Sequence, residues 1–127
     1  MDPQAVKTDK APLPRGPYNQ AVRVGDTIYV AGQIPIDPTT NQVVEGGIEV
    51  QTRRVLDNVA AILEEAGSSL DRVVKTTIFL LDVGEFAQMN AVYAEYFTGI
   101  TPARSTVQVA ALPGAGVRLM IDAIAVR

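Results

Sequence analysis

A helical pattern followed closely by a strand pattern, in the middle of the chain, most constrains the fold. From Ile48 to Ala66 apolar residues recur at spacings of three and four, which predicts an amphipathic helix with Gly67 as its C-terminal cap. The run from Val73 to Leu81 is β-branched and apolar, as in a strand that is covered on at least one face. A helix of about 18 residues and a strand of about eight both span roughly 27 Å, so the two can pack as matching layers.

The segments before this unit predict strands and turns. Ala21–Val24 and Thr27–Ala31 alternate apolar and other residues on either side of Gly25 and Asp26, which predicts a β-hairpin. The run from Asp37 to Asn41 predicts a turn, because Pro suits its second position and Asn tolerates a left-handed backbone. Residues 1–12 are polar and punctuated by proline, and we expect them to form an N-terminal arm.

The segments after it predict a second helix and two more strands. Asp82 is expected to cap a helix over about Glu85–Phe97, with Glu85 bonding back as in a capping box. Strands are predicted for 104–112 and 117–126, separated by a Pro-Gly turn.

The order of these elements predicts an α+β fold with a mixed β-sheet and two helices packed on one face. A length of 127 residues fits a single domain over 1–127. The last two strands carry apolar residues on both alternations, and one layer of helices cannot cover both faces of a sheet. We therefore expect a homo-oligomer to cover the second face.

Composition excludes several classes of function. The net charge is -3 and there is no Cys or His, so thiol nucleophiles, disulfides, imidazole bases and His-containing metal sites are excluded. An acidic chain lacks the clustered Lys and Arg that bind phosphates, so nucleic acid is not an expected partner. The N-terminus resembles no targeting signal and no apolar run approaches the roughly 20 residues of a membrane span. We expect a cytoplasmic protein without a membrane role.

The inventory leaves Arg104 and Asp122 as the residues best placed for chemistry. Arg104 begins a strand in which it shares a face with Thr106 and Gln108, and Asp122 is the one charge among seven apolar residues of the last strand. The structural explanation is that each lies at a sheet edge or in an interface salt bridge. The functional alternative is that Arg104 binds a small carboxylate with its planar fork of donors, while Asp122 orients water or exchanges protons. If the last two strands form a hairpin, the two residues lie toward opposite ends.

Six short blocks in one order make the chain resemble the RidA family, also called YjgF. The resemblance runs from about Ala11 to Arg127, and six ordered blocks are far more specific than any one of them. They are Gly16–Val22 (GPYNQAV), Ala31–Pro35 (AGQIP), Val74–Thr77 (VKTT), Asn90–Tyr93 (NAVY), Pro102–Ser105 (PARS) and Val109–Pro113 (VAALP).

This resemblance implies a chorismate-mutase-like homotrimer with three sites in clefts between subunits. It also implies hydrolysis of reactive 2-enamines and 2-imines, such as 2-aminoacrylate and 2-iminopropanoate, to a 2-keto acid and ammonia, without a cofactor or metal. In the implied site Arg104 grips the substrate carboxylate, Tyr18 and Asn90 shape the cleft, and Gly32 permits close approach of the backbone.

Three site positions depart from the residues common in active members of that family. Ala31 stands where Ser is common, Thr106 where Cys is common and Asp122 where Glu is common. Asp is about one methylene shorter than Glu, enough to break a direct hydrogen bond unless water bridges the gap. Two alternatives to the imine deaminase therefore stay open: a non-catalytic module that senses 2-keto acids or related metabolites, and an endoribonuclease or translation inhibitor.

Overall fold

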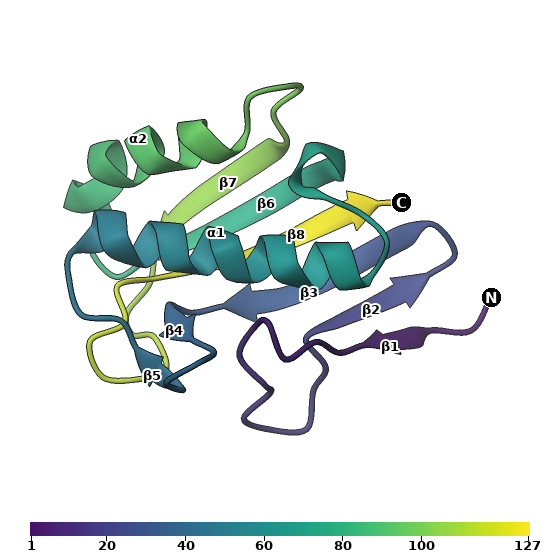
Figure 1. The fold of residues 1–127 in the computed structure, drawn as a ribbon. Coiled ribbons are helices and arrows are strands. Elements are labelled where there is room, and N and C mark those ends of the chain that lie inside the picture. Colours follow the sequence, from purple (N-terminus) through teal and green to yellow (C-terminus); the bar gives the residue numbers. More distant parts are fainter.

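One mixed β-sheet forms a layer on which both helices lie, as Figure 1 shows for the computed structural model, which describes residues 1–127. The strand order is β1-β2-β3-β8-β6-β7, and only β6 and β7 pair in parallel. The six strands are β1 (Gln4–Val6), β2 (Ala21–Val24), β3 (Thr27–Gln33), β6 (Val73–Leu80), β7 (Ala103–Gln108) and β8 (Leu119–Val126). A separate small pair consists of β4 (Ile36–Asp37) and β5 (Gln42–Val43).

The long helix α1 (Ile48–Glu65) begins and ends close to where the pattern predicts. Gly67 has a φ of +84°, and the Ser68 N–H donates to the Leu63 carbonyl at 2.8 Å, which closes the helix with a left-handed C-terminal turn. The predicted hairpin is confirmed as β2 and β3, and Asn41 takes the expected left-handed backbone with a φ of 60°.

The expected capping box of the second helix is only half right. The Asp82 carboxylate accepts a hydrogen bond from the Gly84 N–H at 2.8 Å, but this caps a short 3-10 turn over Val83–Glu85. The helix α2 (Phe86–Tyr96) begins after that turn. Glu85 does not bond back to the cap, because its carboxylate binds Arg118 through both oxygens.

The N-terminal arm contains a short strand that the sequence did not predict. Its residues 4–6 form β1 at one edge of the sheet, a strand too short to give a visible pattern. The buried side chain of Gln20 holds the following residues, because its amide nitrogen donates to the carbonyls of Thr8, Ala11 and Pro12 and its oxygen accepts from the Thr8 N–H. One side chain thus replaces the backbone pairing that a longer strand would supply.

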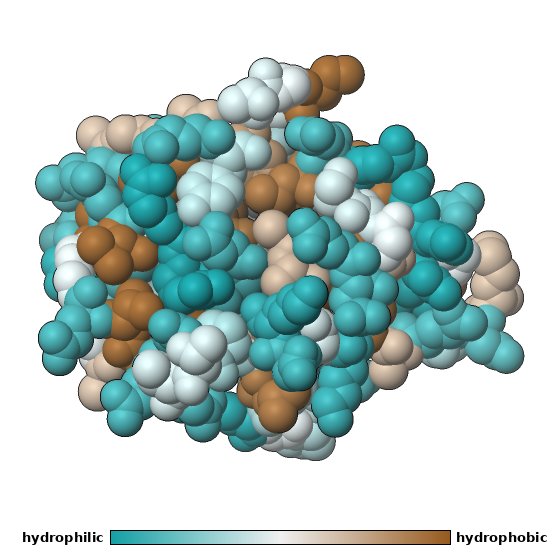
Figure 2. All heavy atoms as spheres, viewed as in Figure 1, coloured by the Kyte–Doolittle hydropathy of each residue, from teal (hydrophilic) through white to brown (hydrophobic).

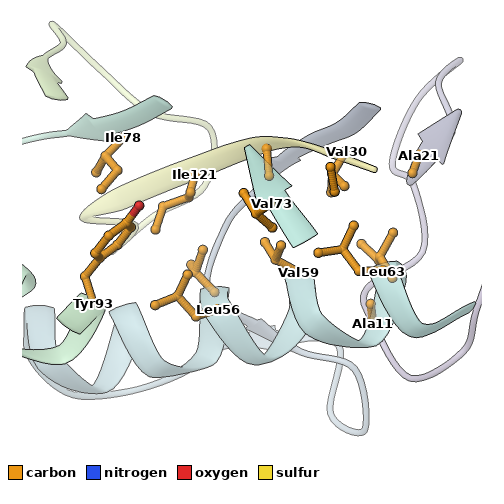
Figure 3. Packing of buried hydrophobic residues seen from close by; sticks show 14 of the residues in the cluster. Ala11, Ala21, Val30, Leu56, Val59, Leu63, Val73, Ile78, Tyr93 and Ile121 are labelled. Atoms are coloured by element: carbon orange, nitrogen blue, oxygen red, sulfur yellow. The ribbon is translucent and has the colours of Figure 1, made fainter. Parts of the chain in front are cut away.

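A continuous apolar core fills the space between the helices and the sheet. Figure 3 shows Leu56 and Val59 of α1 pointing toward strand residues such as Ile121 and Val73. Burial alternates along β8, where Leu119, Ile121, Ala123 and Ala125 are buried and the residues between them are half-buried. Neither helix has the length and hydropathy that a membrane crossing requires.

The helices cover one face of the sheet and leave the other open. Figure 2 views the helix-covered side, where hydrophilic residues predominate and hydrophobic ones lie in separate patches. The open face presents the half-buried side chains of β8, which are Met120, Asp122, Ile124 and Val126, together with the half-exposed Tyr29 of β3.

Candidate functional site

Arg104 is the second residue of β7, the strand at one edge of the sheet, and its side chain lies on the helix-covered face. Its guanidinium carbon is 4.9 Å from the ring centre of Tyr93 and 5.4 Å from that of Phe86, two residues of α2. The chain contains two ion pairs, Arg53–Glu95 and Arg118–Glu85, and Arg104 takes part in neither. Its positive charge is therefore held by aromatic rings and left free of any carboxylate.

The guanidinium lines an open hollow of about 410 Å³ between α2 and the start of β7. One cation beside apolar walls suits a small acid whose carboxylate meets the cation and whose carbon chain meets the walls. The lining residues are Asn90, Tyr93, Ala94, Phe97, Thr101, Pro102 and Arg104.

Tyr93 connects this hollow to the sheet. Its side chain is 6% exposed and points toward the strands, as Figure 3 shows, and its hydroxyl lies 2.8 Å from the Thr76 hydroxyl. Burial raises the pKa of Tyr93 above its ordinary value, while the Thr76 hydrogen bond and the charge of Arg104 oppose that shift. The phenol is therefore neutral at physiological pH.

Asn90 brings an unused acceptor to the wall of the same hollow. Its side-chain oxygen is the one buried polar side-chain atom of the chain without a hydrogen-bond partner. An unpaired buried acceptor costs about 1–3 kcal/mol, which a donor bound beside it would recover. The structure thus places Asn90 and Arg104 in one hollow, where the Asn90 oxygen has no donor and the Arg104 guanidinium has no carboxylate partner.

Tyr18 and Gly32 lie together, but elsewhere. Both line a smaller hollow of about 30 Å³ between the N-terminal loop and the end of β3. The Tyr18 hydroxyl accepts a hydrogen bond from the Arg15 N–H at 3.2 Å. A Cβ on Gly32 would lie 2.7 Å from the sulfur of Met120, so the missing side chain gives room to Met120. The sequence interpretation did not single out Met120.

Tyr18 and Gly32 do not reach the hollow of Asn90 and Arg104 within one copy of the chain. Strands β8 and β6 separate β3 from β7. At roughly 4.8 Å between neighbouring strands, the two outer strands lie about 14 Å apart.

Asp122 lies on the face of the sheet opposite to Arg104. In the register of β6, Thr76 opposes Arg104 while Thr77 opposes both Ser105 and Asp122. Successive side chains point to opposite faces, so Arg104 shares the helix-covered face with Thr76, and Asp122 shares the open face with Thr77. The hairpin considered for the last two strands does not form, because β6 lies between them.

Two further predicted residues lie in strands β3 and β7. Ala31 lies in β3 where the register with β8 is irregular, between Val30 and Gln33, and its backbone N–H donates to the Gln20 carbonyl at 2.9 Å. Thr106 follows Arg104 by two residues in β7 and is half-buried on the helix-covered face. No group of three or more acidic, His or Cys side chains is close enough to hold a metal ion.

Comparison with known proteins shows which family the chain belongs to. The sequence pattern of the family described as Endoribonuclease L-PSP matches residues 8–127. The chain belongs to this family, the RidA/YjgF family. A RutC family protein of Pyrococcus abyssi is 56% identical over 113 residues, which are 89% of each chain. The 2-iminobutanoate/2-iminopropanoate deaminase of Mus musculus is 46% identical over 124 residues, which cover 98% of this chain and 91% of the mouse protein.

A solved RidA/YjgF structure shows the same fold. The crystal structure of the YjgF gene product from E. coli superposes with a TM-score of 0.93 at 45% identity and covers 98% of both chains. The α+β architecture with two helices on a mixed sheet is thus confirmed as that of the RidA/YjgF family.

Two aromatic residues of the site were missed by the sequence interpretation. Phe86 and Tyr93 were assigned to the helix face that packs on the core. This is confirmed for Tyr93, which belongs to the core cluster, whereas Phe86 is 37% exposed. What the prediction did not include is that both rings also face the guanidinium of Arg104. Helical spacing gave no sign of this contact, because it depends on which strand lies under α2. The one available signal was the position of Tyr93 inside the Asn90–Tyr93 block.

Proposed function

We propose that this RidA/YjgF protein hydrolyses reactive 2-enamine and 2-imine acids to 2-keto acids and ammonia. The observation that carries the proposal is the Arg104 guanidinium, which lines a hollow of suitable size and has no carboxylate partner in the chain. The name of the mouse relative, a 2-iminobutanoate/2-iminopropanoate deaminase, supports the same reaction.

In this reaction the protein mainly binds and orients. Two N–H groups of Arg104 donate to the two carboxylate oxygens of the substrate, which fixes the neighbouring imine carbon. A 2-enamine first tautomerises to the 2-imine as a proton moves from its nitrogen to C3. Water then adds across the carbon–nitrogen double bond and forms a carbinolamine. Its hydroxyl group gives up a proton as the nitrogen takes one up, and the carbon–nitrogen bond breaks to release ammonia and leave the keto group. Orientation alone can lower such a barrier by several kcal/mol, and the proposal requires no cofactor.

We further propose that the site is completed between copies of the chain in a homotrimer. The open face of the sheet carries apolar side chains that a second copy would cover. Tyr18, Ala31, Gly32 and Asp122 lie too far from Arg104, or on the wrong face, to act with it in one copy. In a cleft between subunits, residues of one copy can act on a carboxylate that Arg104 of another copy holds.

A second candidate function is a module that binds 2-keto acids without catalysis. The position of Asp122 favours it, because no carboxylate lines the hollow beside Arg104. In that case the Arg104 hollow would bind the keto acid as a signal and no acid–base group would be needed.

The decisive assay generates imines with an amino-acid oxidase and measures keto-acid release with and without the protein. We expect acceleration by the wild type and none by Arg104→Ala. Arg53→Ala is the matched control, because Arg53 is an exposed arginine of α1 that is already bound to Glu95. Equal activity of the wild type and Arg104→Ala would refute the carboxylate-binding role.

Further arms separate the alternatives. If the wild type binds a 2-keto acid in calorimetry but accelerates no hydrolysis, the chain is a binding module. RNA cleavage that survives both repurification and Arg104→Ala would instead support the endoribonuclease described for the family. Asp122→Asn tests the open face: we expect a lower kcat with an unchanged KM. A monomer mass in sedimentation would refute the intersubunit site.

A further inference from the structure

We infer that Phe86 and Tyr93 form an aromatic cradle that positions the guanidinium of Arg104 for its ligand. The inference rests on the proposed carboxylate-binding role of Arg104. It assigns a function to two residues of α2 that have none in the proposed reaction.

The geometry places the charge of Arg104 against both rings. Its guanidinium carbon lies over the Tyr93 ring at 4.9 Å and over the Phe86 ring at 5.4 Å from the centre. Both distances are within the roughly 6 Å over which a cation is attracted to the face of an aromatic ring. Two rings from one helix therefore hold an arginine that comes from the edge strand.

The Tyr93 ring is itself fixed to the sheet beside Arg104. Tyr93 is almost fully buried, and its hydroxyl is hydrogen-bonded to Thr76 of β6. Thr76 is the residue of β6 that pairs with Arg104 in the parallel register. The backbone pairing, the hydroxyl pair and the ring contact thus form a closed loop that sets where the guanidinium lies.

An aromatic support suits a binding arginine better than a carboxylate support would. A carboxylate would neutralise the guanidinium and occupy its N–H donors, so a substrate carboxylate would have to displace it. A ring attracts the cation through its quadrupole and leaves the net charge in place. Holding a long, flexible side chain before the ligand arrives also reduces the ordering that binding requires.

The Tyr93 hydroxyl is committed to Thr76, so Tyr93 acts here through its ring. This makes Tyr93 a positioning residue, and it predicts that the ring can be kept while the hydroxyl is lost. Tyr93→Phe should preserve the function of the cradle, whereas Tyr93→Leu and Phe86→Leu should impair it. Phe86 is 37% exposed, so Phe86→Leu tests the cradle even if Tyr93→Leu fails to fold.

The first measurement reads Arg104 without any ligand. We would follow the Nε–H group of Arg104 by ¹⁵N relaxation, assigned through its loss in Arg104→Ala. We expect an ordered group in the wild type and in Tyr93→Phe, and a mobile one in Phe86→Leu. Tyr96→Leu is the control, because Tyr96 lies on the same helix but bonds to Asp57 and not to Arg104. Unchanged order in Phe86→Leu would overturn the inference.

The second measurement is binding of 2-oxobutanoate by calorimetry. We expect Phe86→Leu to weaken binding by about three- to tenfold, the range that one cation–aromatic contact supports. In an Arg104→Ala background the same substitution should change residual binding by less than about twofold. An equal loss in both backgrounds would show a merely structural role.

These readouts separate the cradle from the proposed reaction. If the wild type binds the keto acid and keeps Arg104 ordered but hydrolyses no imine, the deaminase function is refuted and the aromatic cradle is still supported. If the wild type hydrolyses imines but Arg104 is equally mobile in the wild type and in Phe86→Leu, the aromatic cradle is refuted and the deaminase function is still supported.

Discussion

The two halves of the predicted site differ in whether their polar groups already have partners. In the Arg104 half, which contains Asn90, Tyr93 and Arg104, the guanidinium has no carboxylate and the Asn90 oxygen has no donor. In the Tyr18 half, which contains Arg15, Tyr18 and Gly32, the hydroxyl and the arginine are both bonded within the chain. Polar groups without partners are where we expect a ligand to bind, and we expect the Tyr18 half to shape the cleft without holding the ligand.

The two halves differ in this way because Arg104 and Tyr18 are carried by different kinds of element. Arg104 projects from an edge strand under one helix, where nothing of opposite charge is in reach. Tyr18 belongs to a proline-rich loop whose course is fixed by its own hydrogen bonds, those of Gln20 above all. A loop without strands on both sides must satisfy its polar groups locally.

The largest expected effect tests this contrast with two arginines. Arg104→Lys keeps the charge but loses the fork of donors, so we expect keto-acid binding to weaken by about 10- to 100-fold. Arg15→Lys in the other half loses only the hydrogen bonds to Asn41 and should change binding by less than about threefold. Calorimetry on the two variants measures both. Similar losses would show that the halves do not differ as described.

The next effect concerns packing in the Tyr18 half. Gly32→Ala would place a Cβ 2.7 Å from the sulfur and 2.9 Å from Cγ of Met120, and we expect a loss of about 1–2 kcal/mol in the free energy of unfolding. Gly99→Ala, where no atom lies within 4 Å, is the control and should be nearly neutral. Urea titrations give both values. Adding Met120→Ala should remove the extra cost of the alanine, and a cost that persists would locate the strain elsewhere.

A smaller effect is expected from the hydroxyl of Tyr18. Tyr18→Phe removes one exposed hydrogen bond, the 3.2 Å contact from the Arg15 N–H. We expect a loss of no more than about 1 kcal/mol in unfolding free energy, with keto-acid binding nearly unchanged. A loss of binding as large as that of Arg104→Lys would show that the hydroxyl contacts the ligand directly. It would contradict the expectation that Tyr18 only shapes the cleft.

The smallest expected effect is that of the Tyr93 phenol on the free energy of unfolding, which becomes visible only at alkaline pH. Its pKa is raised above the ordinary 10.0, chiefly by burial, so the folded chain holds the phenol proton more tightly than the unfolded chain. This contribution is complete below about pH 10 and is lost as pH rises through the raised pKa. Unfolding titrations should show a steeper alkaline decline for the wild type than for Tyr93→Phe. Parallel curves would show that the phenol is not protected in the fold.

The sequence predicted the elements with strong patterns and missed those without one. The helix over Ile48–Ala66 and the hairpin at Gly25 were visible because periodicity and turn residues agree there. The strand β1 was missed because three residues cannot establish an alternation, and its order depends on Gln20. Glu85 was misassigned because its preferred partner, Arg118, lies 33 residues away and becomes a neighbour only in the fold.

The site was predictable only as far as local sequence determines it. Arg104 and Asn90 were identified, and the structure brings them to one hollow. That Asp122 lies on the opposite face could not be read from the sequence, since it depends on β6 lying between β7 and β8. For the same reason the contact of Arg104 with Phe86 and Tyr93 was invisible, because it requires knowing which strand α2 covers.

The place of β8 has a consequence for how the chain reaches this fold during synthesis. The last strand of the sequence lies in the middle of the sheet, between β3 and β6. Before Leu119–Val126 leaves the ribosome, the N-terminal strands and the β6–α2–β7 unit share no strand pairing. The nascent chain then exposes two unpaired inner edges, which are sites of incorrect association. Native pairing across the sheet must wait until Leu119–Val126 has left the ribosome, and the two edges are open to incorrect pairing until then.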